Sequence, residues 1–171
     1  MRSCGECNLC CKALGVAEST VESSPFKIFK EKPQGEWCQY VKAGDGCGVY
    51  RHRPQPCRDF SCIWLDSQTL DDKYRPDRIQ VVFVEPVNFP ELHIIHAHVD
   101  EKDLEFYMND QHPAVPVVRG YVATGWHVCI VAGTRRRVLT NDFDDLKKRL
   151  ATYKSSDPRK HQELILTLKG A

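Results

Sequence analysis

Hydrophobic and polar positions alternate regularly only in the second part of the chain, beyond about residue 67. Residues 78–87 and 92–99 are rich in β-branched side chains and predict two strands, and residues 126–140 predict a β-hairpin. Between these strands a helix is expected around Val115–Ala123. The distal part of the chain is therefore predicted to combine a sheet with at least one helix.

A last helix is predicted to begin near Asn141. Aspartates stand in its first turn and basic residues stand nearer its end, as the helix dipole favours. Phe143, Leu146, Leu150 and Tyr153 recur at spacings of three and four, so they are expected to form one buried face. Together these patterns predict an α+β fold, with a mostly antiparallel sheet and covering helices.

The first 66 residues have little periodicity and are rich in Cys, Gly and Pro, which is typical of a loop-rich module. A short helix is expected from the spacing of apolar positions between Cys7 and Leu14. A second helix is predicted to begin at Ser24-Pro25 and to end before Pro33. The glycines of residues 44–48 predict a tight turn around Cys47.

Eight of the nine cysteines fall within this loop-rich part. They are Cys4, Cys7, Cys10, Cys11, Cys38, Cys47, Cys57 and Cys62. Cys129 alone lies beyond them and is expected in the core. The N-terminus has no apolar run typical of a signal peptide and no stretch is apolar enough to span a membrane, so we expect a cytoplasmic protein. Stable disulfides are rare in that compartment, and clustered cysteines there more often bind metals or act in catalysis.

Thiolates are soft ligands that suit zinc, iron-sulfur clusters and copper(I). The first four cysteines have the spacing C-x2-C-x2-C-C, which supplies only one half of a zinc ribbon and is similar to a ferredoxin run. Eight thiols allow either two four-ligand sites or one polynuclear site. Adjacent helical residues point about 100° apart. We therefore expect Cys10 and Cys11 to serve different metals, or only one of them to ligate.

This chemistry predicts a cysteine-rich metal-binding module over residues 1–66 and an α+β part over residues 67–171 that packs with it into one compact domain. The net charge is +1 with mixed signs, so nothing favours binding to nucleic acid or to a membrane. The expected partner is a metal ion, zinc or iron, with a protein partner left open.

The motifs "CGECNLCC", "WCQY" and "GCGVYRHRPQPCRDFSCIW" resemble the bacterial CxxCxxCC cysteine-cluster family of zinc- or iron-chelating proteins. The resemblance covers about residues 4–64 and extends weakly through Arg75-Pro76-Asp77. It implies metal chelation by the eight cysteines and leaves the metal open. Some larger relatives are linked to flagellin lysine N-methylation and to an iron-sulfur cluster. This chain is much shorter and has no glycine-rich loop for S-adenosylmethionine, so that activity does not transfer.

Charged and aromatic residues surround the later cysteines. Arg53 and Arg58 flank Cys57, where they would either offset thiolate charge or pair with surface aspartates. Tyr50 and Trp64 are expected to pack over the site and to exclude water.

The histidines of the distal part suggest a second candidate site. On a strand His96 and His98 share a face, while His93 points the other way and His127 on a neighbouring strand is available as a third ligand.

Three classes of function follow from these patterns. The first is a metal-binding protein that serves in metal handling, redox chemistry or protein modification. The second is a metal-dependent enzyme, in which the metal works with the distal sheet. The third is a zinc-stabilised module that binds another protein. An enzyme needs an open coordination position or a pocket that reaches the metal, whereas a structural site is closed.

Overall fold

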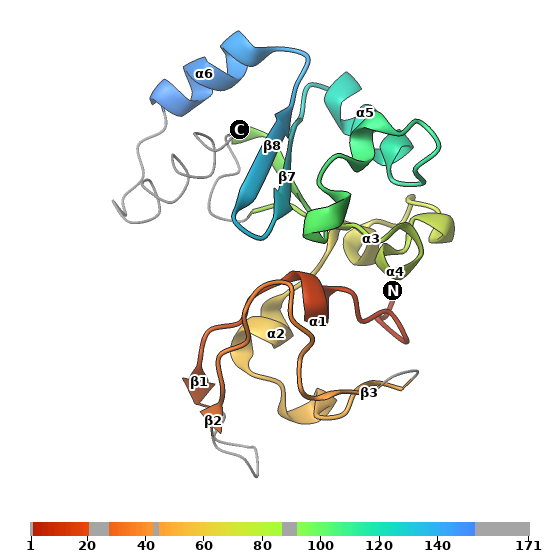
Figure 1. Ribbon diagram of the computed structural model, residues 1–171, viewed down its shortest axis with the longest axis vertical. Coiled ribbons are helices and arrows are strands. Elements are labelled where there is room, and N and C mark those ends of the chain that lie inside the picture. The colour runs from red at the N-terminus through yellow and green to blue at the C-terminus, as the bar shows by residue number, and fades with distance from the viewer. Residues whose placement is uncertain (1, 21–27, 43–44, 87–91, 153–171) are drawn as a thin grey trace. The chain divides into compact units, whose positions relative to one another are not determined.

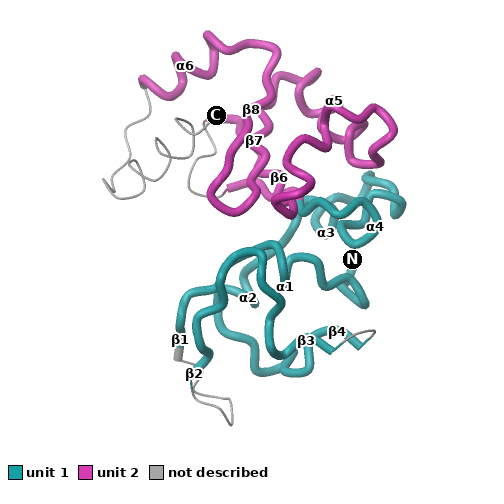
Figure 2. Tube along the Cα trace, viewed as in Figure 1, with its two compact units in different colours: residues 1–82 teal, residues 83–171 magenta. Residues whose placement is uncertain are grey.

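The computed structural model describes residues 2–20, 28–42, 45–86 and 92–152. Its elements form an α+β fold, as predicted. The chain divides into two compact units, Met1–Val82 (unit 1) and Phe83–Ala171 (unit 2), which Figure 2 distinguishes by colour. The division falls inside a strand and lies later than the boundary expected after residue 66. The packing of the two parts into one domain stays a prediction.

A four-stranded, mostly antiparallel sheet is the centre of unit 2 (Figure 1). Its strands, in spatial order, are β5 (Val82–Val84), β6 (Ile94–His98), β7 (His127–Ala132) and β8 (Arg135–Leu139). Strands β6 and β7 are parallel, whereas β7 and β8 form the predicted hairpin. Every residue of β7 is buried, so the sheet is covered on both faces at this strand.

Two longer helices accompany the sheet, α5 (Val115–Ala123) and α6 (Phe143–Thr152), and both were predicted. Two short 3-10 helices, η4 (Glu101–Asp103) and η5 (Phe106–Met108), precede α5. Leu146 of α6 packs in a buried cluster with Leu92 and Ile94.

One residue of the face predicted for α6 is misplaced. Phe143 is 56% exposed, so the prediction that it is buried was wrong. It is the first residue of the helix, and the ammonium group of Lys147 lies 4.8 Å from its ring centroid. Tyr153, the last residue of that predicted face, lies outside the described residues.

Unit 1 consists of short elements joined by loops, as the sequence predicted. They are α1 (Cys10–Ala13), β1 (Ser19–Thr20), β2 (Ile28–Phe29), β3 (Val41–Lys42), β4 (Gly46–Cys47), η1 (Tyr50–His52), α2 (Gln55–Asp59), α3 (Ile63–Asp66), η2 (Asp72–Tyr74) and α4 (Pro76–Ile79). Strands β1 and β2 form one antiparallel pair, and β3 and β4 form another. Within the described part of unit 1 no helix exceeds five residues.

Two element predictions need correction. The helix expected from Ser24-Pro25 to Pro33 begins outside the described residues, and its second half is wrong because Ile28–Phe29 is a strand paired with Ser19–Thr20. The strand expected over residues 78–87 is shortened to β5, because Pro76 begins the helix α4 before it. No helix in the described part of the chain is both long enough and apolar enough to cross a membrane.

Candidate functional site

Backbone hydrogen bonds hold the first cysteine segment against the loop that carries Cys38. The amide of Cys7 donates to the carbonyl of Cys4 at 2.8 Å, which closes a turn just before α1. The amide of Cys38 donates to the carbonyl of Cys11 at 3.1 Å. Two segments that are distant in the sequence are therefore fixed side by side at their cysteines.

A close backbone approach brings the β3–β4 hairpin to the same turn. Gly46 has a φ of +88°, a conformation that favours glycine. A β-carbon at this position would lie 3.2 Å from the carbonyl oxygen of Gly5, so a side chain here would crowd the turn. Cys47, the next residue, is thereby held close to the first cysteine segment.

Four thiols line a small cavity of about 10 Å³. The cysteines are Cys4, Cys7, Cys10 and Cys62, and the remaining lining residues are Phe60, Trp64, Leu65, Pro76 and Val82. We call it the small cavity. None of the described residues that line it is charged. It has room for about one small atom.

Arg2 links the N-terminal segment to residues beside the small cavity. Its guanidinium donates to the carbonyl of Trp64 at 2.9 Å and also to the carbonyl of Leu70. The same group stacks over the Trp64 ring at 4.8 Å from the centroid. Trp64 is buried and lines the small cavity, as expected for a residue that excludes water. Cys4, two residues after Arg2, is thus held beside the segment that carries Cys62.

Seven thiols line a larger cavity of about 140 Å³, which we call the large cavity. They are Cys4, Cys7, Cys10, Cys11, Cys38, Cys47 and Cys57. The two cavities together are lined by all eight cysteines that the sequence singled out, and three of the eight line both cavities. Tyr50 also lines the large cavity, although it is 54% exposed.

Burial makes most of these thiols hard to ionise. It raises the pKa of Cys7 and of Cys57 to about 11, and it also raises the pKa of Cys4, Cys47 and Cys62. A bound metal cation would offset the negative charge of the thiolates and so favour the loss of their protons.

Cys10 and Cys11 differ from each other although they are neighbours in α1. A side-chain hydrogen bond from Cys10 lowers the pKa of Cys11 to about 7, and nearby Lys32 and Arg53 act in the same direction. The same hydrogen bond, together with burial, raises the pKa of Cys10. The two thiols therefore approach each other. The expectation that they serve different metals, or that only one of them ligates, stays a prediction.

Lys32 is a buried cation on the large cavity that the sequence did not indicate. Only 7% of the residue is exposed, and its ammonium group donates to three carbonyl oxygens, of Lys12 at 3.2 Å, Pro33 at 2.9 Å and Glu36 at 2.8 Å. Lys12 lies in α1 and the other two residues precede Cys38. Lys32 therefore ties the helix of the first cysteines to the loop of Cys38.

Of the two arginines that flank Cys57, only Arg53 lines the large cavity. It stacks over the Tyr50 ring at 3.9 Å from the centroid. Arg58 instead donates to Gln55 at 2.8 Å on the exposed side of α2. Of the two alternatives left open, a cation beside the thiols is met by Arg53, whereas Arg58 pairs with Gln55.

Asp77 is a second residue that sequence reasoning missed. Its carboxylate accepts hydrogen bonds from Arg75 at 2.7 and 2.8 Å and also interacts with the thiol of Cys7. Although burial opposes it, the paired Arg75 lowers the pKa of Asp77. Asp77 is therefore a fixed anion that accepts from a buried thiol. The only signal in the sequence was the Arg75-Pro76-Asp77 extension of the cysteine motifs.

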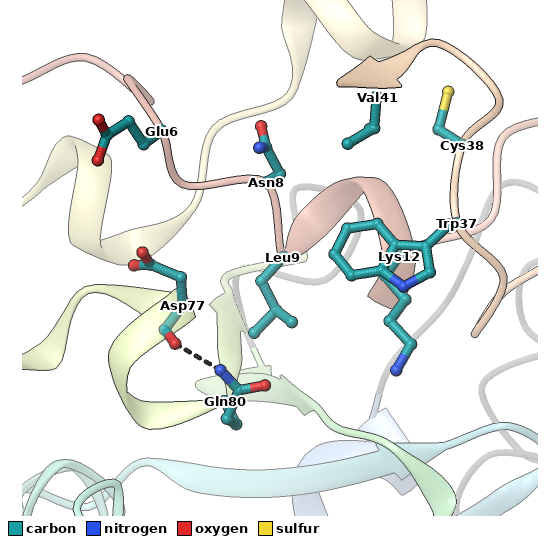
Figure 3. Close-up of a pocket in the computed structure, with 9 residues that line it drawn as sticks. All are labelled: Glu6, Asn8, Leu9, Lys12, Trp37, Cys38, Val41, Asp77 and Gln80. Atoms are coloured by element: carbon teal, nitrogen blue, oxygen red, sulfur yellow. Dashed lines mark hydrogen bonds between the residues drawn. The ribbon is translucent and has the colours of Figure 1, made fainter. Parts of the chain in front are cut away.

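An open groove of about 470 Å³ lies on another side of α1 (Figure 3). Cys38 is the one cysteine among the described residues that line it, and its sulfur points away from Trp37. The charged groups in the groove have mixed signs, with Glu6 and Asp77 facing Lys12 across it. The groove therefore does not gather the thiols.

The histidines of unit 2 are brought together only in part. The rings of His96 and His98 lie 5.8 Å apart on β6, on one face as predicted. His127 faces other groups, because its Nδ1 lies 2.8 Å from Thr140 and its Nε2 lies 3.5 Å from Asp145. The expectation of a third histidine ligand was wrong. Cys129 is fully buried, as predicted.

In residues 2–20, 28–42, 45–86 and 92–152, no three His, Cys, Asp or Glu side chains are arranged so as to hold a metal ion as they stand. The chemistry of the thiols nevertheless suits a soft metal, and the eight cysteines line the two cavities of unit 1. Ligation would require these thiols to lose their protons and to turn inward. Searches against family models, curated proteins and solved structures found no match to this chain.

Proposed function

We propose that this chain binds zinc or iron through the eight cysteines of unit 1, with iron held as an ion or as an iron-sulfur cluster. The observation that carries the proposal is that eight cysteines, from segments between residues 4 and 62, line two cavities that share three of them. The resemblance of the motifs to the CxxCxxCC cysteine-cluster family supports the same chemistry.

The metal would also stabilise a unit that has little regular structure. Metal binding by structural cysteine sites contributes on the order of 10 kcal/mol, which is comparable to the stability of a whole small domain. Unit 1 has short helices and two-residue strands, so it has more to gain from such a contribution than unit 2. The proposal takes the chain to act in a reducing compartment such as the cytoplasm, where thiols stay free to ligate.

Elemental analysis and a visible spectrum of protein purified without oxygen test this proposal. We expect either colourless protein with bound zinc, or coloured protein with iron and acid-labile sulfide. Cys57→Ser should lower the metal content, whereas Cys129→Ala, a change in unit 2, should leave it unchanged. Wild-type protein that holds no metal and takes none up when reduced would refute the proposal.

A further inference from the structure

The eight thiols separate into two groups of four. Cys4, Cys7, Cys10 and Cys62 line the small cavity. The other four, Cys11, Cys38, Cys47 and Cys57, line only the large cavity. The two groups are contributed by different segments except at α1, where Cys10 belongs to the first group and Cys11 to the second.

The two cavities differ in size and charge. The small cavity, at about 10 Å³, is walled by apolar side chains, and none of its described lining residues is charged. The large cavity, at about 140 Å³, is lined by two cations, Lys32 and Arg53. One tetrahedral ion needs little space, whereas a centre of several ions with four thiolates needs more space and carries negative charge that cations offset.

We propose that unit 1 holds two unlike metal centres. The first is a closed site of one tetrahedral ion on Cys4, Cys7, Cys10 and Cys62. The second is a larger centre, of more than one metal ion bridged by inorganic sulfide, on Cys11, Cys38, Cys47 and Cys57. This inference rests on the proposed function and assigns the neighbours Cys10 and Cys11 to different centres.

Protection from alkylation tests the grouping on the wild-type chain, without any variant that could misfold. Reduced, metal-free protein receives rising amounts of Zn²⁺ without oxygen, and a thiol reagent followed by mass spectrometry identifies the cysteines that remain free. We expect two blocks of four to become protected separately, with Cys10 in one block and Cys11 in the other. Protection of all eight together, or blocks of different membership, would overturn the inference.

Metal stoichiometry of matched variants tests the difference between the centres. Cys62→Ser and Cys10→Ser should each lose one metal ion per chain, measured on protein as purified. Cys57→Ser and Cys11→Ser should retain one ion and lose all the others. Equal losses in all four variants would contradict the inference while leaving the proposed function intact. A wild-type chain that binds no metal would overturn both.

Discussion

The two units of this chain are built by different means. In unit 2 a sheet with a fully buried central strand and two longer helices removes many apolar side chains from water. Among its described residues unit 1 buries few large apolar side chains, and its segments are held together by hydrogen bonds from a few backbone amides and from the side chains of Lys32 and Arg2. The contrast indicates that unit 2 is stable through its core, whereas unit 1 depends on bonds at a small number of points.

Removal of the metal proposed for unit 1 should produce the largest difference between the units. We expect a loss on the order of 10 kcal/mol of stabilisation, confined to unit 1, because the buried thiols then have no ligand that links them. Hydrogen exchange before and after treatment with a chelator measures the loss of stability separately in each unit. Equal loss of protection in β7 and in α1 would show that the two units do not differ in this way.

A cavity created in the sheet should destabilise unit 2 and leave unit 1 unaffected. Ile130 is fully buried in β7, and Ile130→Ala is expected to cost about 2 to 5 kcal/mol of folding free energy in unit 2. Urea denaturation measures this cost, and metal content should not change. Ile28→Ala, at a residue that is 54% exposed in unit 1, is the control, and its effect should stay within about 0.5 kcal/mol.

The ammonium group of Lys32 should contribute more to the stability of unit 1 than a surface lysine does. Lys32→Met keeps the length of the side chain but leaves three carbonyl oxygens without their donor, which is expected to cost about 3 kcal/mol. Metal affinity should fall in the same variant, and competition with a coloured chelator measures it. The exposed neighbour Lys30 provides the control, since Lys30→Met should leave both quantities unchanged.

Acid should weaken unit 2 through its histidines. Burial lowers the pKa of His96 to about 4 and that of His98 to about 3, whereas in the unfolded chain both titrate near 6.5. Above pH 6.5 both states are neutral. As the pH falls from 6.5 toward 4 only the unfolded chain gains protons, so the two histidines together should cost unit 2 about 3 kcal/mol by pH 5.

Denaturation of the wild type and of the double variant His96→Gln/His98→Gln at several pH values measures this effect. The double variant should show a flatter dependence on pH. An identical slope in both proteins would assign the loss to other groups.

The elements that follow from a regular local pattern were predicted correctly from the sequence. The features that depend on contacts between distant residues were not. The β7–β8 hairpin and α5 follow from local periodicity. The eight cysteines were singled out by their spacing, and their role as metal ligands stays a prediction. Ile28–Phe29 was misassigned because it forms a strand by pairing with Ser19–Thr20, and the local sequence does not reveal this pairing. Lys32 could not be found either, since its three carbonyl acceptors come together only in the folded chain.

The adjacency of Cys10 and Cys11 in α1 has a consequence for how the two proposed centres fill. One peptide bond joins a ligand of the first centre to a ligand of the second, so ordering the backbone at one of them also orders it at the other. The entropy cost of fixing that turn is then met only once. Metal bound at the first centre should therefore raise the affinity of the second centre for its own metal, compared with a Cys62→Ser chain whose first centre stays empty.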